Sequence, residues 1–158
     1  MKRLILFLTN LFWVAVVVAQ PLPKIELKPV FAALKGERPV WMSEAPDGSG
    51  RFFVVYQDGK ILVVKKGSDG GDAKEFLNIE DRHPYFENED GLLSIAFHPG
   101  FKTNSLFYIY YTQKNTPEQM KQFQDDRPTS FPYRSVVSEF RISATDPDKA
   151  DMSTEAEH

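Results

Sequence analysis

The chain has 158 residues, of which 42% are hydrophobic and 26% are charged, and its formal net charge is -3. This length allows one domain, and the composition is ordinary for a globular protein. The small net charge gives no bulk electrostatic attraction to nucleic acid or to anionic lipid. The chain contains no cysteine, which excludes disulfides, thiolate metal sites, thiol nucleophiles and an acylated lipoprotein anchor.

The first 19 residues have the pattern of a secretory signal peptide. Lys2 and Arg3 supply the positive start, residues 4–18 are mostly apolar, and residues 17–19 resemble a signal peptidase site. The apolar run is shorter than the ~20 residues that a membrane span needs. We therefore expect cleavage rather than a stable membrane span, and export of the protein to a periplasm or to the outside of the cell.

Residues 20–37 contain several prolines and are expected to form an extended lead-in, with a short strand at residues 30–34. Residues 57–59, Gln-Asp-Gly, are typical of a tight hairpin turn. The predicted strands are short runs that are apolar and rich in β-branched or aromatic residues. They cover residues 38–44, 51–56, 60–65, 75–79, 92–97, 106–112 and 134–142.

Three segments are predicted to lack strands. Residues 80–90 form an acidic loop, residues 114–132 are a polar excursion with at most one helical turn, and residues 143–158 show no apolar periodicity. Many short strands with turn signals and hardly any helix are typical of a sandwich, a barrel or a propeller. Periodicity alone does not choose among these three all-β architectures.

Five motifs occur in order along the predicted strands and turns. They are Pro-Asp-Gly-Ser at 46–49, Gln-Asp-Gly-Lys-Ile at 57–61, Gly-Leu-Leu at 91–93, Ala-Phe-His-Pro at 96–99 and Tyr-Ile-Tyr-Tyr-Thr at 108–112. In this order and spacing they resemble the opening of the glucose/sorbosone dehydrogenase family, the soluble quinoprotein sugar dehydrogenases. Ser94 departs from the glycine that is usual at its position in the family.

The resemblance implies an all-β fold that comprises the first two or so blades of a six-bladed β-propeller, formed by residues 38–158. It also implies that the parent protein binds pyrroloquinoline quinone (PQQ) and calcium, oxidises an aldose at its anomeric carbon and passes electrons to an acceptor. In the family, the catalytic histidine and the calcium ligands follow the part that this chain matches. We therefore assign no catalytic or metal-binding residue, and we expect the chain by itself to be inactive.

Two alternatives remain open at this point. The first is a non-enzymatic propeller that binds a protein, as in the hedgehog-interacting protein, because one fold supports several functions. The second is a truncated product without activity. The sugar dehydrogenase and the binding protein would differ in a histidine of a later blade and in oxygen ligands for calcium.

One cofactor-binding position carries over from the family to this chain. In the soluble glucose dehydrogenases, a glutamine two residues before Gly-Leu-Leu contacts the quinone, and Glu89 stands at that position. A carboxylate beside a tricarboxylate cofactor repels it unless the carboxyl is protonated or a cation intervenes. The alternative interpretation is that Glu89 is one acid of a solvated loop.

Other candidate residues have structural explanations that we favour. His98 precedes a proline at the end of a strand and is expected to bond a backbone group. The acidic loop offers oxygen ligands for calcium, but it lacks the regular spacing and the glycine turn of a calcium-binding loop, so a solvated charge run is favoured. This loop contains Glu80, Asp81, His83, Glu87, Glu89 and Asp90.

Aromatic side chains on the predicted strands offer a second possible contact with sugar. Aromatic residues of all-β proteins are more often part of the core than stacked on a ligand. The residues concerned are Trp41, Tyr108, Tyr110 and Tyr111. His158 is the last residue of the sequence and is assigned no role.

We predict that the mature protein begins at Gln20, because the expected cleavage follows Ala19. Mass spectrometry of the exported protein measures this N-terminus directly. Recovery of the protein in a membrane fraction with residues 1–19 still attached would contradict the prediction and would favour an uncleaved anchor.

Overall fold

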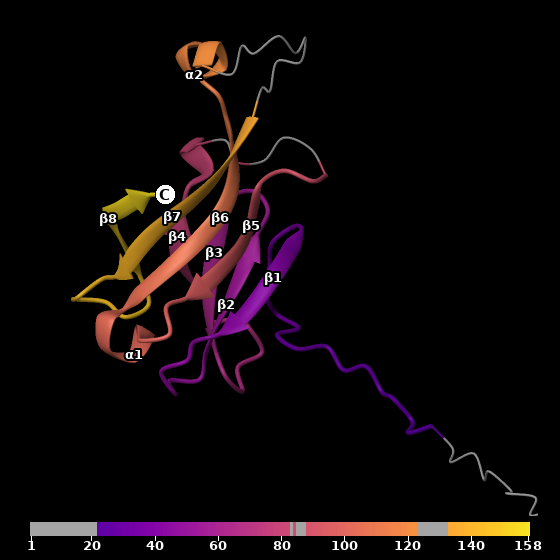
Figure 1. Cartoon of the computed structure of the whole chain (residues 1–158). Coiled ribbons are helices and arrows are strands. Elements are labelled where there is room, and N and C mark those ends of the chain that lie inside the picture. The colour runs from indigo at the N-terminus through magenta and orange to yellow at the C-terminus, as the bar shows by residue number, and fades with distance from the viewer. Residues whose placement is uncertain (1–21, 83, 85–87, 123–132) are drawn as a thin grey trace, which may run out of the picture.

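The computed structural model describes residues 22–82, 84, 88–122 and 133–158, and these form two four-stranded antiparallel sheets (Figure 1). In each sheet the strands lie in chain order. The first sheet contains β1 (Pro39–Glu44), β2 (Arg51–Tyr56), β3 (Lys60–Lys65) and β4 (Lys74–Asn78). The second contains β5 (Leu92–Phe97), β6 (Leu106–Lys114), β7 (Tyr133–Ile142) and β8 (Ala150–Glu157). The short helical elements are η1 (Glu80–Arg82), α1 (Phe101–Asn104) and α2 (Pro117–Gln122).

The two sheets pack face to face around one apolar core. Their first strands, β1 and β5, are neighbours, and their last strands, β4 and β8, also make contact. Between the sheets, the ring centroids of Phe76 and Phe107 lie 5.0 Å apart, and those of Phe53 and Phe97 lie 5.1 Å apart. Two stacked four-stranded meanders are the arrangement of neighbouring propeller blades. The all-β prediction is therefore confirmed.

The structure confirms seven predicted strands, but it corrects two other predictions. Residues 30–34 form no strand. Instead, the Leu34 N–H donates to the Phe31 carbonyl at 2.9 Å in a tight turn, with Phe31 at a φ of 56°. The apolar side chains of Phe31 and Leu34 cover the outer face of the first sheet, against Val54 and Tyr56. This packing explains why residues 30–34 have the apolar pattern that predicts a strand.

The second correction concerns residues 143–158, which contain β8 although they show no apolar periodicity. β8 is the outer strand of its sheet, and none of its residues is fully buried. The backbone of β8 pairs with β7. The side chain of Glu155, in β8, binds Arg82 of η1, with 2.6 Å between Glu155 Oε2 and Arg82 Nη2. A strand held by backbone pairing and an ion pair needs no apolar alternation.

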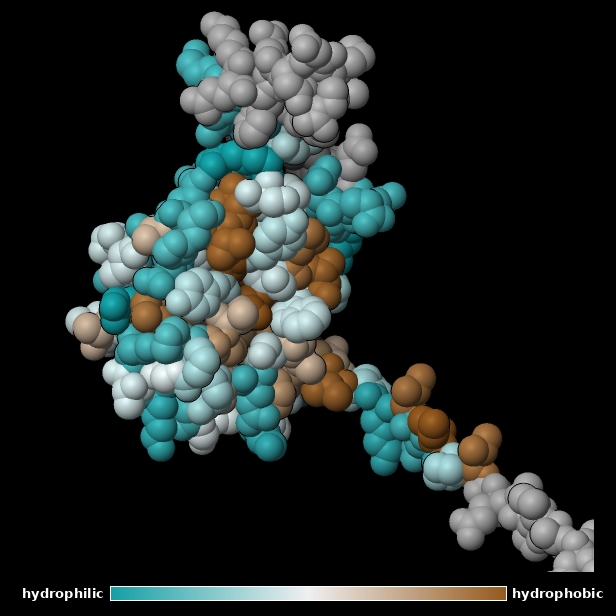
Figure 2. All heavy atoms as spheres, viewed as in Figure 1, coloured by the Kyte–Doolittle hydropathy of each residue, from teal (hydrophilic) through white to brown (hydrophobic). Residues whose placement is uncertain are grey.

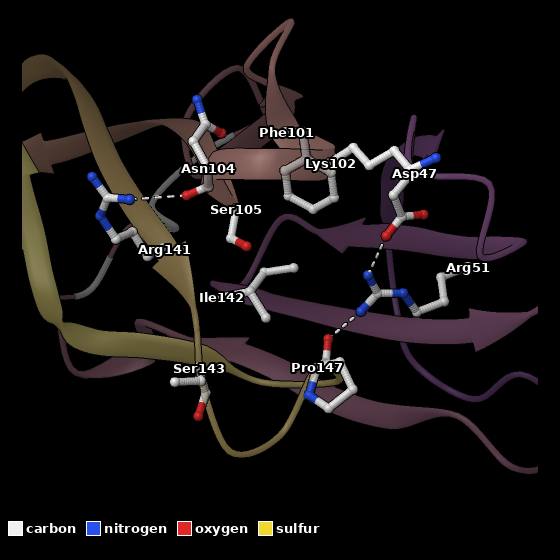
Figure 3. A pocket seen from close by; sticks show the side chains of 11 residues that line it. Asp47, Arg51, Phe101, Lys102, Asn104, Ser105, Arg141, Ile142, Ser143 and Pro147 are labelled. Atoms are coloured by element: carbon white, nitrogen blue, oxygen red, sulfur yellow. Dashed lines mark hydrogen bonds and ion pairs between the residues drawn. The ribbon is translucent and has the colours of Figure 1, made fainter.

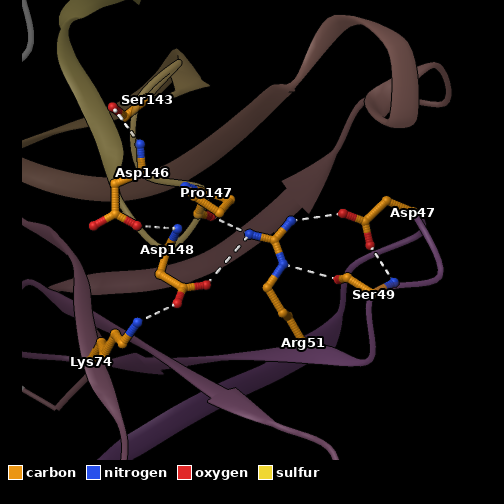
Figure 4. Close-up of polar contacts among 8 residues, drawn as sticks. All are labelled: Asp47, Ser49, Arg51, Lys74, Ser143, Asp146, Pro147 and Asp148. Atoms are coloured by element: carbon orange, nitrogen blue, oxygen red, sulfur yellow. Dashed lines mark hydrogen bonds and ion pairs between the residues drawn. The ribbon is translucent and has the colours of Figure 1, made fainter.

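A buried arginine joins the two sheets at the end that carries α1. Arg51 of β2 donates to the Asp47 carboxylate at 2.7 Å and to the carbonyl of Pro147, which lies in the β7–β8 turn (Figure 3). The neighbouring Asp148 lies 3.8 Å from Arg51 and accepts a 2.7 Å hydrogen bond from Lys74 of β4 (Figure 4). The side chain of Arg51 is only 10% exposed, so this contact between sheets is well shielded from solvent.

Several large apolar side chains remain at the surface of the described residues. Figure 2 shows apolar residues over the sheets and along the lead-in, where residues 22–29 form no helix or strand. On β1, three consecutive residues are between 40% and 51% exposed. The exposed large apolar residues on the described strands are Val40, Trp41, Met42, Val137 and Met152.

We predict that the 158-residue chain, expressed alone, self-associates or is only loosely folded. Exposed apolar side chains on β1 and on the outer face of the second sheet favour association, as does any sheet edge left unpaired. Light scattering and thermal denaturation test this prediction. A monodisperse monomer with a sharp cooperative melt would contradict it and would show that the two sheets are self-sufficient.

The ion pair between Arg51 and Asp47 should make the stability of the fold depend on pH in acid. Partial burial raises the pKa of Asp47, but hydrogen bonds from the Ser49 hydroxyl and backbone N–H and from Arg51 outweigh this effect and lower the pKa to about 2. Because the folded pKa lies below the ordinary value of 3.8, the carboxylate stabilises the fold above about pH 4, and this contribution is lost as the pH falls towards 2.

We therefore predict that Asp47→Asn lowers the free energy of unfolding by about 1–3 kcal/mol at neutral pH. The difference from the wild type should shrink between about pH 4 and pH 2, as measured by denaturation at each pH. Asp81→Asn, which changes an exposed acid of η1, is the matched control. A difference that stays constant across this pH range would contradict the assigned role of the Asp47 carboxylate.

Candidate functional site

Two of the sequence motifs meet at the end of the sheets opposite to α1. Gln57, in the β2–β3 turn, is 2% exposed. Its side-chain Nε2 donates to the carbonyl of Asn88 at 2.9 Å and to that of Asp90 at 2.6 Å. The backbone carbonyl of Gln57 accepts the Leu92 N–H at 3.0 Å. The β2–β3 turn therefore holds the segment that leads into β5.

Gly91 is required where this segment approaches the turn. Its φ is +123°, and a Cβ at this position would lie 2.5 Å from the Gln57 carbonyl oxygen. The Gly91 N–H donates to the Thr112 hydroxyl at 2.7 Å, and its carbonyl accepts the Thr112 N–H at 3.0 Å. Any side chain would break this packing. The glycine of the Gly-Leu-Leu motif thus has a structural cause.

Glu89 lies in the turn between Asn88 and Asp90, and its side chain is exposed. Arg38 lies beside this turn, with its Nη2 donating to Asn88 Oδ1 at 2.9 Å. The φ of Arg38 is 58°, which is uncommon for a residue with a side chain, and its carbonyl accepts the Gln57 N–H at 3.2 Å. Residue 89 is therefore presented to solvent on a backbone that is fixed on both sides.

An ion pair lies at the same end of the first sheet. Lys60 Nζ lies 2.7 Å from Glu80 Oε1, and this hydrogen bond raises the pKa of Lys60 and lowers the pKa of Glu80. Both side chains are partly exposed, so the pair adds little stability. Sequence reasoning did not single out Arg38 as a charge near residue 89, because 50 positions separate it in sequence from Asn88, which it contacts.

The two histidine candidates among the described residues lie away from Glu89. His98 is at the α1 end, where its Nδ1 accepts the Gly100 N–H at 2.8 Å and pairs with Asn104 Nδ2 at 2.8 Å. It therefore binds a backbone group, as expected from its position at the corner. His158 Nε2 lies 3.9 Å from Glu139 Oε2 at the outer face of the second sheet.

The aromatic candidates fall into two groups. Tyr111 is 1% exposed and belongs to the core, and its hydroxyl accepts a 3.3 Å hydrogen bond from Arg82. Tyr108 and Tyr110 point to the other face of β6, and Trp41 is 51% exposed on β1. A hydrogen bond with Glu139 raises the pKa of Tyr108. The structure does not bring these aromatic side chains together as a stacking platform.

The acidic loop is only partly described. His83 and Glu87 lie outside the described residues. Within the described part of the chain, no group of three or more His, Asp or Glu side chains is placed to hold a metal ion. No helix in that part is long and apolar enough to cross a membrane.

A cavity of about 390 Å³ lies at the α1 end, between the loops of the two sheets (Figure 3). Phe101 and Ile142 form its apolar side, while Arg51 and Arg141 lie on opposite sides of it. Arg141 Nη1 donates to the Asn104 carbonyl at 2.9 Å. Sequence reasoning missed this cavity, because its residues come from loops far apart in the chain. It lies at the opposite end from Glu89.

The charges around residue 89 do not match those of a quinone with three carboxylates. The exposed Glu89 carboxylate repels such an anion. Arg38 adds one nearby cation, through its hydrogen bond to Asn88. The described residues at this position thus supply a fixed backbone, one carboxylate and one nearby cation.

Comparison with known proteins places the chain in a family. The family model for glucose/sorbosone dehydrogenase matches residues 36–130. The HIPL2 protein of Arabidopsis thaliana is 30% identical over 63% of this chain, and the human hedgehog-interacting protein is 29% identical over 74%. The matched regions span 18% and 16% of those two proteins, so the chain covers less than a fifth of their length.

A solved structure has a fold similar to that of the two sheets. The PQQ-bound aldose sugar dehydrogenase of Streptomyces coelicolor matches 79% of this chain and 32% of its own chain, with a TM-score of 0.51 and 17% sequence identity. At this identity the similarity concerns the fold, and the two sheets correspond to blades of an incomplete propeller. Because the family model covers more than half of the sequence, the chain belongs to the glucose/sorbosone dehydrogenase family.

Proposed function

We propose that this chain contributes two blades to an exported quinoprotein that oxidises aldoses at the anomeric carbon. The observation that carries the proposal is the buried Gln57 contact, which fixes the turn around Glu89; the resemblance to the family implies a quinone contact at this residue. Family membership and the propeller fold support the same function.

The division of labour follows from what this chain contains. PQQ, when bound, would accept the hydride that leaves the anomeric carbon of the sugar. The described residues hold and orient one turn beside that site, and Glu89 and Arg38 set its local charge. The proton-accepting histidine, the calcium ligands and the contact with an electron acceptor belong, in this proposal, to other parts of the protein.

The proposed location is the periplasm or the extracellular space. Lys2, Arg3 and the apolar residues 4–18 support export through their resemblance to a signal peptide. The absence of cysteine is compatible with either location, since the fold has an apolar core of aromatic and aliphatic side chains and no disulfides.

A second candidate function is protein binding without redox chemistry. Two points favour it. The resemblance to the family implies a glutamine at the position of Glu89, where this chain has an acid, and the relatives include hedgehog-interacting proteins. A propeller that keeps its fold but loses charge complementarity to the quinone would retain only its binding surfaces.

The proposed function predicts PQQ-dependent oxidation by the protein in its full natural length. After loading with PQQ and calcium, it should reduce a dye when glucose or another aldose is supplied. The 158-residue chain alone should show no such activity. Omission of PQQ should abolish the reaction, which is followed by the absorbance of the dye.

Glu89→Gln tests the local charge in the same protein. Removal of the like charge should lower the Kd for PQQ about tenfold, which corresponds to about 1.4 kcal/mol. Glu44→Gln makes the same charge change at the far end of β1 and should leave the Kd unchanged. A folded full-length protein that neither binds PQQ nor oxidises any aldose, with either residue at 89, would reject the dehydrogenase and favour the binding protein.

A further inference from the structure

We propose that Gln57 is a positioning residue that holds residue 89 in place for its ligand. The identity of that ligand rests on the proposed function, but the positioning role rests on geometry alone. Gln57 belongs to the β2–β3 turn, whereas residue 89 precedes β5 in the other sheet. A residue of one blade thus sets the backbone of a loop that leads into the next blade.

The side chain of Gln57 binds the backbone on both sides of residue 89. Its Nε2 donates to the carbonyls of Asn88 and Asp90, at 2.9 and 2.6 Å, which are the residues immediately before and after Glu89. With both neighbouring carbonyls directed towards the buried amide, the side chain of residue 89 is left on the solvent side of the turn. This orientation matches its exposure in the structure.

The backbone of Gln57 is itself held by hydrogen bonds. The Gln57 N–H donates to the Arg38 carbonyl at 3.2 Å, and the Gln57 carbonyl accepts the Leu92 N–H at 3.0 Å. Gly91 lets the two segments approach, because any Cβ there would lie within 2.6 Å of both the carbonyl oxygen and the Cγ of Gln57. The backbone of Gln57 therefore cannot shift to compensate for a change of its side chain.

The chemistry of the contact requires an amide. A carboxamide nitrogen carries two N–H groups, one for each carbonyl. Methionine has a similar length but no donor. A glutamate carboxylate would place acceptors against two acceptors, and only its protonated form could donate one hydrogen bond. Because Gln57 is 2% exposed, solvent does not readily replace the lost donors.

Hydrogen exchange in the full-length protein tests the positioning role without any ligand. Within residues 88–92, the amides of Gly91 and Leu92 are hydrogen-bonded, to the Thr112 hydroxyl and to the Gln57 carbonyl. Gln57→Met should accelerate the exchange of these two amides by roughly 10- to 100-fold, about tenfold for each lost hydrogen bond. The amides of β2 and β3 should keep their protection. Gln113→Met removes a side-chain hydrogen bond to Arg134 and is the matched control, expected to leave residues 88–92 unchanged.

Gln57→Glu provides a second and independent test. At neutral pH it should expose residues 88–92 to exchange as Gln57→Met does. On acidification its protection, normalised for the intrinsic pH dependence of exchange, should recover in part, since the protonated carboxyl donates one bond again. Gln57→Met should show no such recovery. If Gln57→Met does not fold, the pH dependence of Gln57→Glu still decides the matter.

The outcomes separate positioning from a purely structural role and from the proposed function. Unchanged exchange at residues 88–92, or faster exchange spread evenly over β2 and β3, would overturn the proposal. Faster exchange confined to residues 88–92 supports it, whether or not PQQ binds. If PQQ binds, the roughly tenfold gain in affinity from Glu89→Gln should vanish in the Gln57→Met background. Absence of PQQ binding in all variants would reject PQQ as the ligand but would leave the positioning role of Gln57 intact.

Discussion

The rest of the structure depends on a continuous line of phenylalanine rings between the two sheets. Phe53 and Phe76 of the first sheet lie 4.6 Å apart by ring centroids, and Phe76 continues to Phe107 and then to Phe140 of the second sheet at 5.0 and 5.7 Å. All four are at most 3% exposed. Burial of such large apolar surfaces is the main source of stability for a small β domain without disulfides. It also fixes the relative orientation of the sheets, on which every contact between their loops depends.

Polar contacts at both ends of this core fix the position of one sheet relative to the other. Arg51 reaches from β2 to the β7–β8 turn at one end, and Arg82 binds Glu155 of β8 near the other. A buried arginine left without its partners is costly, so sliding of one sheet over the other is opposed. The Gln57 contact depends on the same relative position, since it spans from the first sheet to the entry of the second.

The sequence predicted most of this fold because local patterns determined it. The hairpin over 51–65 follows from two β-branched runs around Gln-Asp-Gly, and it appears as β2 and β3 with the expected bounds. β8 was missed because it is a polar outer strand, held by backbone pairing and by Glu155. Residues 30–34 were assigned wrongly, because apolar side chains that cover a sheet look like those of a strand within it.

The candidate site was less accessible to sequence reasoning, since it depends on contacts across long separations. Glu89 was identified by its place in a motif, whereas Gln57 and Arg38 act on its neighbours from more than 30 positions away. Their roles follow only from the relative position of the two sheets. The scaffold and the charge at residue 89 are therefore separable features: Gln57, Gly91 and the buried core fix where residue 89 stands, and they do so irrespective of its chemical identity. A glutamine there would face an anionic quinone without repulsion, while a glutamate favours a cationic or neutral partner. One change of side chain at residue 89 would thus alter the charge of this turn while the backbone that carries it stays in place.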